Sequence, residues 1–144
     1  QSFELSQLGD FILRRRDSLF AYQLAVVIDD AAQSVTSVVR GADLLSSTPW
    51  QIALQQALGL PLMDYAHLPL ITDANKGDKL SKQTGAKAID NSTAASNICL
   101  ALTQLGQPLP EQAHRLSVNQ LLEWAINYWQ IEQIPKTAII VTES

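Results

Sequence analysis

A polar stretch near the middle of the chain limits the folds that are possible. Residues 72–90 (TDANKGDKLSKQTGAKAID) carry four lysines and two glycines and show no apolar periodicity. Loops of this length are unusual inside a compact domain and are commonly functional or disordered. We therefore expect three regions: an α/β part over residues 1–72, a lysine loop over 73–90 and a small α-helical part over 91–144.

Strand-like runs are concentrated in the first region. Apolar and β-branched residues predict strands over 11–15 (FILRR), 24–28 (LAVVI) and 35–39 (VTSVV), and an extended segment over 67–71 (HLPLI). The proline inside the last of these pushes it towards a strand end. A brief extended tail is expected over 138–141.

A helix is predicted between these runs. Thr48 is a suitable N-cap, Pro49 suits the first helical position, and Gln51 completes a capping box. The helix should run through Leu58 and end at Gly59, since glycine is common just after a helix.

Two further helices are predicted after the lysine loop. Asn91 or Ser92 can cap the first, which should end at Gly106. Ser117 and Gln120 form a second capping box. The face that follows it has apolar residues at helical spacing: Val118, Leu121, Leu122, Ala125, Ile126 and Trp129.

Composition narrows the class of protein. The 144 residues are 47% apolar and 17% charged, and no apolar run approaches the ~20 residues needed to span a bilayer. Cys99 is the single cysteine, so an internal disulfide framework or a cysteine-rich zinc site is excluded, and a cytoplasmic location is expected. The net charge of −4 argues against global electrostatic binding of nucleic acid.

The lysine loop holds the sharpest local motif. Lys79 and Lys82 flank Ser81, with Gly77 and Gly85 on either side. Mobile lysine charges on a glycine-flanked loop could close over a polyphosphate. The alternative is a solvated surface loop. The order of residues is not that of a Walker A loop.

Tyr22 and Arg40 form a second candidate pair. Both are expected at strand ends, where open α/β sheets place ligand groups. An arginine there can hold a carboxylate, and a phenol can add one oriented hydrogen bond. The alternative is an arginine in a surface ion pair and a tyrosine in the core.

Other chemically capable residues favour structural roles. Asp29 and Asp30 are adjacent, so on a strand they would point to opposite faces, which favours a strand end and a turn or helix cap. His67 and His114 have no partner at metal-ligand spacing. Cys99 falls on an apolar helical pattern.

Taken together, the blocks resemble the class I glutamyl-tRNA synthetase family. Residues 11–61 (FILRRRDSLFAYQLAVVIDDAAQSVTSVVRGADLLSSTPWQIALQQALGLP), then HLPLI, then KLSKQ, are similar to its R-x-D-G-x-x-x-Y, V-[IV]-R-G, T-P-x-Q and K-M-S-K-S blocks. The resemblance is continuous over about residues 11–88. It implies the C-terminal half of a Rossmann-type catalytic core, followed by a small α-helical region like a stem-contact domain.

The resemblance also implies roles for individual residues. Tyr22 and Arg40 match the positions that bind glutamate, and Lys82 matches the lysine that contacts ATP, with Lys79 and Ser81 assisting. The lysines would offset the negative charge that develops on the phosphates as the glutamate α-carboxylate displaces pyrophosphate. ATP is thus expected as a substrate, together with Mg²⁺.

Departures from the pattern indicate the glutamyl-queuosine tRNA(Asp) branch of the family. Ala42-Asp43-Leu44 stands where tRNA(Glu)-charging members carry D-D-H, Gln83 replaces an arginine, and only about sixty residues follow the loop. Members of this branch esterify activated glutamate to queuosine at the wobble position of tRNA(Asp). Expected partners are therefore glutamate, ATP and that anticodon stem-loop. No membrane association is expected, and the full-length protein should be a monomer.

The family's H-I-G-H signature is absent from these residues. We expect it upstream, together with the family's zinc site, so the isolated chain should not form the adenylate. Two alternatives stay open: a truncated enzyme charging tRNA(Glu), and a non-catalytic synthetase-like module that binds RNA. Ser18 replaces the glycine of the R-x-D-G turn, and Trp50 stands where a basic residue is common.

Overall fold

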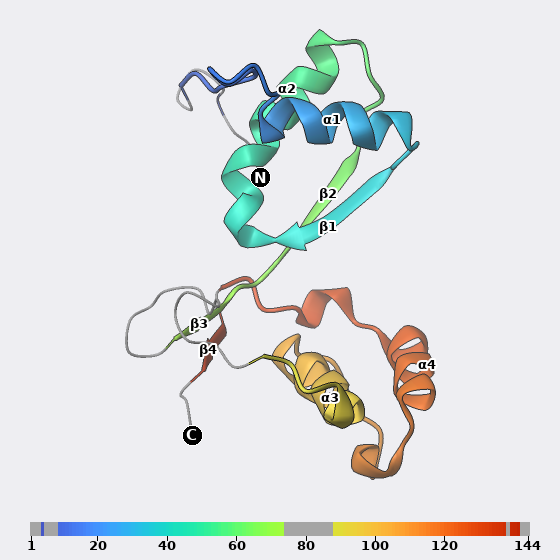
Figure 1. Cartoon of the computed structure of the whole chain (residues 1–144). Helices are drawn as coiled ribbons and strands as arrows, with labels where there is room; N and C mark the ends of the chain where they lie inside the picture. The colour runs from blue at the N-terminus through green and yellow to red at the C-terminus, as the bar shows by residue number, and fades with distance from the viewer. Residues whose placement is uncertain (1–3, 5–8, 74–87, 138, 142–144) are drawn as a thin grey trace. The chain divides into compact units, whose positions relative to one another are not determined.

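The protein is described here by a computed structural model (Figure 1). It describes residues 4, 9–73, 88–137 and 139–141. The chain separates into two compact units, residues 1–68 and 69–144. Most of the expected lysine loop, residues 74–87, lies outside the described residues. No helix in the described ranges is long and apolar enough to cross a membrane.

The first unit is built on two parallel strands, β1 (Ser37–Gly41) and β2 (Asp64–Leu68). Their register places Arg40 opposite His67 and Val38 opposite Tyr65. Burial alternates along both strands, so one face of the pair is covered and the other is exposed. The predicted strand before Arg40 is thereby confirmed, and side chains from both strands share the covered face.

A helical crossover connects the two strands, as parallel pairing requires. It consists of the 3₁₀ helix η2 (Ala42–Ser47) and the α-helix α2 (Thr48–Ala57). The N-cap of α2 is Ser47, so the prediction that Thr48 caps this helix is wrong by one residue. The predicted end is confirmed, because Gly59 adopts a left-handed φ of 65° just beyond it.

The helix α1 (Tyr22–Ala32) corrects the prediction of a strand over 24–28. A short run of apolar β-branched residues has no period of its own that separates a strand from a buried helix. Packing decides: Val27 is 1% exposed, and Gln23 bonds across to Gln51 of α2. That bond also uses the side chain that was expected to complete the capping box of α2.

Residues before α1 form a tight turn. The strand expected over 11–15 is limited to one antiparallel bridge between Arg14 and Phe20. Ser18 sits in this turn with φ 67°, a left-handed conformation that glycine adopts at no steric cost. The glycine usual at this position in the resembling family therefore has a plain backbone reason.

The second unit opens and closes on a pair of parallel strands. β3 (Ile71–Asp73) pairs with β4 (Ile139–Val141), which confirms the predicted extended tail. Between them, the short 3₁₀ helix η4 (Asn91–Thr93) leads into α3 (Ala94–Gln104). The prediction that Asn91 or Ser92 caps the helix is wrong, because both lie inside η4 and the N-cap of α3 is Thr93. Asp90 caps η4, where its carboxylate accepts a hydrogen bond from the Ser92 backbone N–H.

The helix α4 (Val118–Tyr128) has the predicted capping box, in which Ser117 and Gln120 bond reciprocally. It packs against α3 and buries Leu121 completely. The rest of the predicted apolar face is less buried, and Ile126 is 80% exposed. Trp129 lies just past the helix in extended backbone, so its predicted place on the helix face is wrong.

Two short 3₁₀ helices complete this unit, η5 (Ala113–Arg115) before α4 and η6 (Ile131–Gln133) after it. The turn after α3 holds the chain near η6 in place. The buried side chain of Gln107 bonds to the backbone of Gln130, and Gly106 lies directly against the carbonyl of Gln133.

Candidate functional site

Arg40 is the centre of the site, and its guanidinium is half-buried at the end of β1. Nη2 donates to the hydroxyl of Thr48 at 2.7 Å and to the carbonyl of Leu44 at 3.4 Å. Nε donates to Nε2 of His67 at 3.4 Å. The ring of Tyr65 lies 5.1 Å from the guanidinium carbon, within the range of a cation–π contact. Every one of these partners is neutral or apolar in character.

No ion pair joins Arg40 to a carboxylate within the described ranges, where the single salt bridge is Arg15 with Asp17 on the surface. A cation removed from water is costly unless an opposite charge or several hydrogen bonds compensate it. Among the described residues, Arg40 has the hydrogen bonds but no partner of opposite charge. This arrangement suits an arginine that receives an anionic ligand.

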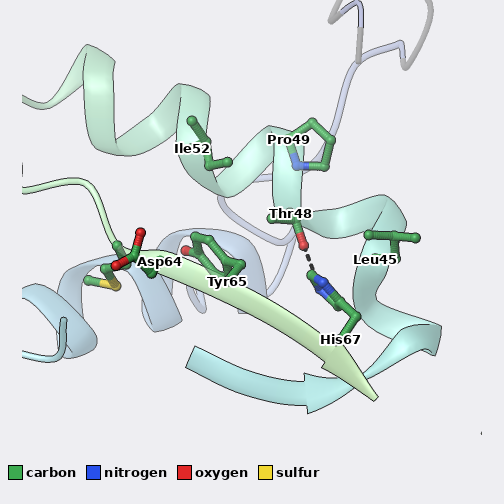
Figure 2. A pocket seen from close by; sticks show the side chains of 8 residues that line it. Leu45, Thr48, Pro49, Ile52, Asp64, Tyr65 and His67 are labelled. Atoms are coloured by element: carbon green, nitrogen blue, oxygen red, sulfur yellow. Dashed lines mark hydrogen bonds between the residues drawn. The ribbon is translucent and has the colours of Figure 1, made fainter. Parts of the chain in front are cut away.

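Thr48 and His67 hold the guanidinium from two different elements. Thr48 is 6% exposed at the start of α2, and its hydroxyl lies 2.9 Å from Nε2 of His67 on β2. Figure 2 shows the two side chains pointing at each other across the space between helix and strand. The cluster ties both strands and the crossover helix together.

The protonation state of His67 follows from its neighbours. Because the Arg40 Nε–H donates to Nε2 of His67, this nitrogen carries no proton and the ring is neutral. Burial, and secondly the charge of Arg40, lower the pKa of His67 below its usual value. A protonated ring would set a second cation against Arg40 and remove the acceptor.

Tyr65 forms the floor beneath Arg40. Its hydroxyl accepts a 2.9 Å hydrogen bond from the side chain of Gln55, which is fully buried on α2. Burial raises the pKa of Tyr65, while the Gln55 hydrogen bond and the Arg40 charge oppose that shift. Asp30 and Tyr22 of α1 add to the rise.

A pocket of about 440 Å³ lies between α2 and β2 in the same unit. Figure 2 shows the side chains that line it, from the crossover on one side and the strand on the other. They mix apolar and polar groups: Leu45, Thr48, Pro49, Ile52, Met63, Asp64, Tyr65 and His67. An apolar wall with a few convergent polar groups is typical of small-molecule sites. Thr48 and His67 belong to both the pocket and the Arg40 cluster.

The structure places one of the two glutamate-site candidates as predicted from the sequence and the other differently. Arg40 lies near the end of β1 as expected. Tyr22 begins α1 instead of a strand, because residues 24–28 are helical, and its side chain is 50% exposed. The ATP-site candidates Lys79, Ser81 and Lys82 lie outside the described residues.

Three residues of the site were missed at the level of sequence. Thr48 was assigned to a cap, His67 to a structural role, and Tyr65 was not considered. The available signal was the spacing of two alternating strands, since β1 and β2 in register bring residues 40 and 67 together. The spacing identifies residues 40 and 67 as neighbours only when the register of the two strands is known, and a single sequence does not determine that register.

The remaining candidates have structural positions. Asp29 and Asp30 lie in the last turns of α1, not at a strand end. Trp50 stacks on Phe11 with ring centroids 5.3 Å apart. Cys99 is half-buried in α3. Within the described part of the chain, no group of three or more His, Cys, Asp or Glu side chains could hold a metal ion.

Comparison with known proteins shows which family the sequence resembles. Residues 2–103 match the family model described as tRNA synthetases class I (E and Q), catalytic domain. The chain is 50% identical over 134 residues to the glutamyl-Q tRNA(Asp) synthetase of Thiobacillus denitrificans, covering 93% of this chain and 44% of that protein. It is 52% identical over 126 residues to the enzyme of that name from Vibrio parahaemolyticus, covering 88% and 42%. The chain thus spans about two-fifths of the length of these curated relatives.

A solved structure shares the fold. The crystal structure of glutamate-tRNA synthetase from Elizabethkingia anophelis matches 94% of this chain and 31% of that one, with a TM-score of 0.68 and 23% sequence identity. The helices and small parallel sheet described above agree with a class I synthetase fold. The resemblance recognised in the sequence is confirmed at the level of the family.

Proposed function

We infer the function from the premise that this chain belongs to the family of class I tRNA synthetase catalytic domains (E and Q). We propose that it is the part of a ligase that binds glutamate for ATP-dependent activation and transfer to queuosine in tRNA(Asp). The names of relatives that are about half identical over nine-tenths of the chain support this acceptor. Charging of tRNA(Glu) is the competing outcome in the experiment below.

One observation carries the proposal: the half-buried cation of Arg40 has hydrogen-bond partners and no carboxylate partner among the described residues. A ligand carboxylate would supply the missing charge. Glutamate has two carboxylates, one of which is needed for the reaction. Arg40 can hold the other, and Tyr22, at the start of α1, would add an oriented hydrogen bond.

The chemistry proposed for the whole enzyme has two steps. An oxygen of the glutamate α-carboxylate attacks the α-phosphorus of ATP, which forms glutamyl adenylate and releases pyrophosphate. A hydroxyl of the queuosine cyclopentene-diol then attacks the acyl carbon, loses its proton, and displaces AMP. Lys79 and Lys82 are proposed to neutralise the charge that develops on the phosphates in the first step, with Ser81 assisting.

Mg²⁺ is proposed to arrive with ATP. Phosphate oxygens and a few protein oxygens commonly hold this ion, so a dedicated protein cage is not required. Zinc is proposed only for the part of the enzyme that precedes these residues in longer family members. When bound, Mg²⁺ would screen the phosphate charges.

We also propose the organisation expected from the sequence. Residues 1–72 would be the second half of the Rossmann-type catalytic domain, 73–90 its lysine loop, and 91–144 a helical region near the RNA. An acidic chain with net charge −4 would recognise an anticodon stem-loop through shape, stacking and local cations. A cytoplasmic monomer is proposed.

Glutamate-dependent exchange of pyrophosphate into ATP tests the first step, using the protein expressed from its complete reading frame. Arg40→Gln should raise the glutamate KM by about 100-fold, since a charge-assisted carboxylate contact is lost. Arg115→Gln is the matched control, because Arg115 lies in the second unit and bonds only to Gln112 among the described residues. Equal effects of the two substitutions would contradict the assignment.

Transfer of labelled glutamate tests the second step. The expected acceptor is tRNA(Asp) that carries queuosine. Mild base should release the label, as it does from an ester. The same tRNA without queuosine should remain unlabelled. Labelling of tRNA(Glu) at its 3′ end would instead identify the tRNA(Glu)-charging enzyme, and exchange without transfer to either tRNA would reject the proposed acceptor.

A further inference from the structure

Thr48 carries an unusual combination of position and bonding. It is the first residue of α2, yet Ser47 is the N-cap and no side-chain capping bond is made there. Threonine near a helix start is normally explained by capping. Here the residue is 6% exposed and its hydroxyl bonds to Arg40 and His67 instead. Its role therefore concerns these two side chains.

The donors of Arg40 can be assigned one by one. Nη2 has two protons, and its two acceptors are Thr48 Oγ1 and the carbonyl of Leu44. Nε has one proton, which His67 Nε2 accepts. Nη1 makes no hydrogen bond to any residue in the described ranges. Of the five N–H groups, the two on Nη1 are left for a ligand.

The Thr48 hydroxyl has one proton and two possible acceptors. It accepts from Arg40, and it can donate either to His67 Nε2 at 2.9 Å or to the Leu44 carbonyl at 3.3 Å. The contact with His67 is the shorter one, and there the Thr48 proton would share the single lone pair of Nε2 with the Arg40 Nε–H. The lowered pKa of His67 supports an unprotonated Nε2. Thr48 thus contacts both the guanidinium of Arg40 and His67, the other side chain that holds the guanidinium.

We propose that Thr48 and His67 are positioning residues that fix Arg40 by Nη2 and Nε and leave Nη1 to bind the substrate carboxylate. The inference rests on the proposed function in one respect, since the carboxylate is taken to be that of glutamate. A long arginine side chain loses considerable freedom when it binds a ligand. Holding it beforehand reduces that cost, so the effect falls on substrate affinity.

The experiment compares Thr48→Val, which keeps the shape and removes the hydroxyl, with Thr48→Ser, which keeps the hydroxyl. The protein is expressed from its complete reading frame. Thr48→Val should raise the glutamate KM about tenfold in pyrophosphate exchange, with kcat and the ATP KM within twofold of wild type. Thr48→Ser should stay near wild type. Thr103→Val is the control, because among the described residues that hydroxyl bonds only to the Cys99 carbonyl within α3.

His67 supplies a second pair of variants should Thr48→Val fail to fold. In His67→Gln the side-chain oxygen replaces Nε2 as acceptor, so the glutamate KM should stay within about threefold of wild type. His67→Leu removes the acceptor and should raise the KM about tenfold. An unchanged glutamate KM in both Thr48→Val and His67→Leu would overturn the positioning role. So would a fall in kcat and a rise in the ATP KM as large as the rise in the glutamate KM.

Nuclear magnetic resonance of the Arg40 guanidinium separates this inference from the proposed function. In the wild-type protein without substrate, the Nε–H and Nη2 protons should exchange slowly with water. Thr48→Val should speed the exchange of the Nη2 protons at least tenfold, and Thr48→Ser should not. Absence of glutamate-dependent exchange in the wild type would reject the proposed function. Unchanged proton exchange in Thr48→Val would reject the positioning role, whatever the substrate.

Discussion

The side-chain amide of Gln107 and the backbone of Gln130 are joined by two hydrogen bonds of opposite direction. Gln107 Nε2 donates to the Gln130 carbonyl at 2.9 Å, and the Gln130 N–H donates to Gln107 Oε1 at 2.8 Å. Nε2 also donates to the Leu105 carbonyl, and the side chain is 6% exposed. This amide binds the end of α4 to the turn after α3.

Replacing Gln107 by glutamate should therefore destabilise the second unit. A carboxylate cannot donate, so the carbonyls of Leu105 and Gln130 would lose this donor and face a negative charge. The cost should be about 2–4 kcal/mol at pH 7. Amide hydrogen exchange in α3 and α4 measures it. Gln107→Met should cost about 1–3 kcal/mol and show no pH dependence between 4 and 7, whereas Gln107→Glu should recover as its carboxyl is protonated. Equal exchange in the glutamate variant and wild type would contradict the assignment.

Gly106 and Gly59 form a matched pair for a second prediction. Both follow a helix with left-handed φ angles, 68° and 65°. A Cβ on Gly59 would meet open space, whereas one on Gly106 would collide with the backbone carbonyl of Gln133. Gly59→Ala should cost about 1 kcal/mol from backbone strain alone. Gly106→Ala should cost about 2–4 kcal/mol, because the carbonyl has to move. Unfolding of each unit, monitored by hydrogen exchange, measures the two costs. Equal costs would show that the Gln133 carbonyl moves away from a Cβ on Gly106 without an energetic penalty.

His67 should make the first unit sensitive to acid. Its pKa is lowered in the folded state by burial and by the Arg40 charge. The folded protein therefore resists protonation, and the unfolded chain binds more protons between the folded pKa and about 6.5. Stability should be complete above about pH 6.5 and fall as the pH decreases through this window.

The stability of His67→Gln provides the control for the acid response. Asp64 lines the same pocket and Tyr65 stacks near the ring, so both remain in the variant as the other titratable neighbours. The wild-type unfolding midpoint should drop between pH 6.5 and 5 by more than that of the variant. Parallel curves would assign the acid response to other groups.

Lys82 is expected to act on the rate of the first step more than on glutamate binding. In the protein expressed from its complete reading frame, Lys82→Ala should lower kcat of pyrophosphate exchange by about 10²–10³-fold, as for loss of a group that stabilises transition-state charge. The glutamate KM should change little. Lys136→Ala, an exposed lysine in the second unit, should leave both constants unchanged. A normal kcat in Lys82→Ala would remove that residue from the role.

Local signals in the sequence predicted those features that depend on a few neighbouring residues. The Ser117 capping box and the helix ends at Gly59 and Gly106 were correct because caps and left-handed turns are decided within one turn of chain. The strand leading to Arg40 was correct for the same reason. The ends of these elements can therefore be predicted from the residues next to them.

Features decided by tertiary packing were missed. The run 24–28 became a helix that packs against α2 and buries Val27, although its composition alone suits either state. Thr48 satisfied the rule for an N-cap while its hydroxyl bonded elsewhere. Arg40 and His67 become neighbours only through the register of β1 and β2, 27 residues apart in sequence. No pattern within either segment records that contact.

The pairing of β3 with β4 has a consequence for folding during synthesis. Ile71 pairs with Ile139, so 68 residues have to be added before this strand finds its partner. At roughly 5–20 residues per second, the ribosome needs on the order of 3–14 seconds to supply them. During that interval the first unit can already fold, while β3 has unmet backbone donors and acceptors at its edge. A nascent chain stalled within that interval would therefore be the species most exposed to aggregation and most in need of a chaperone.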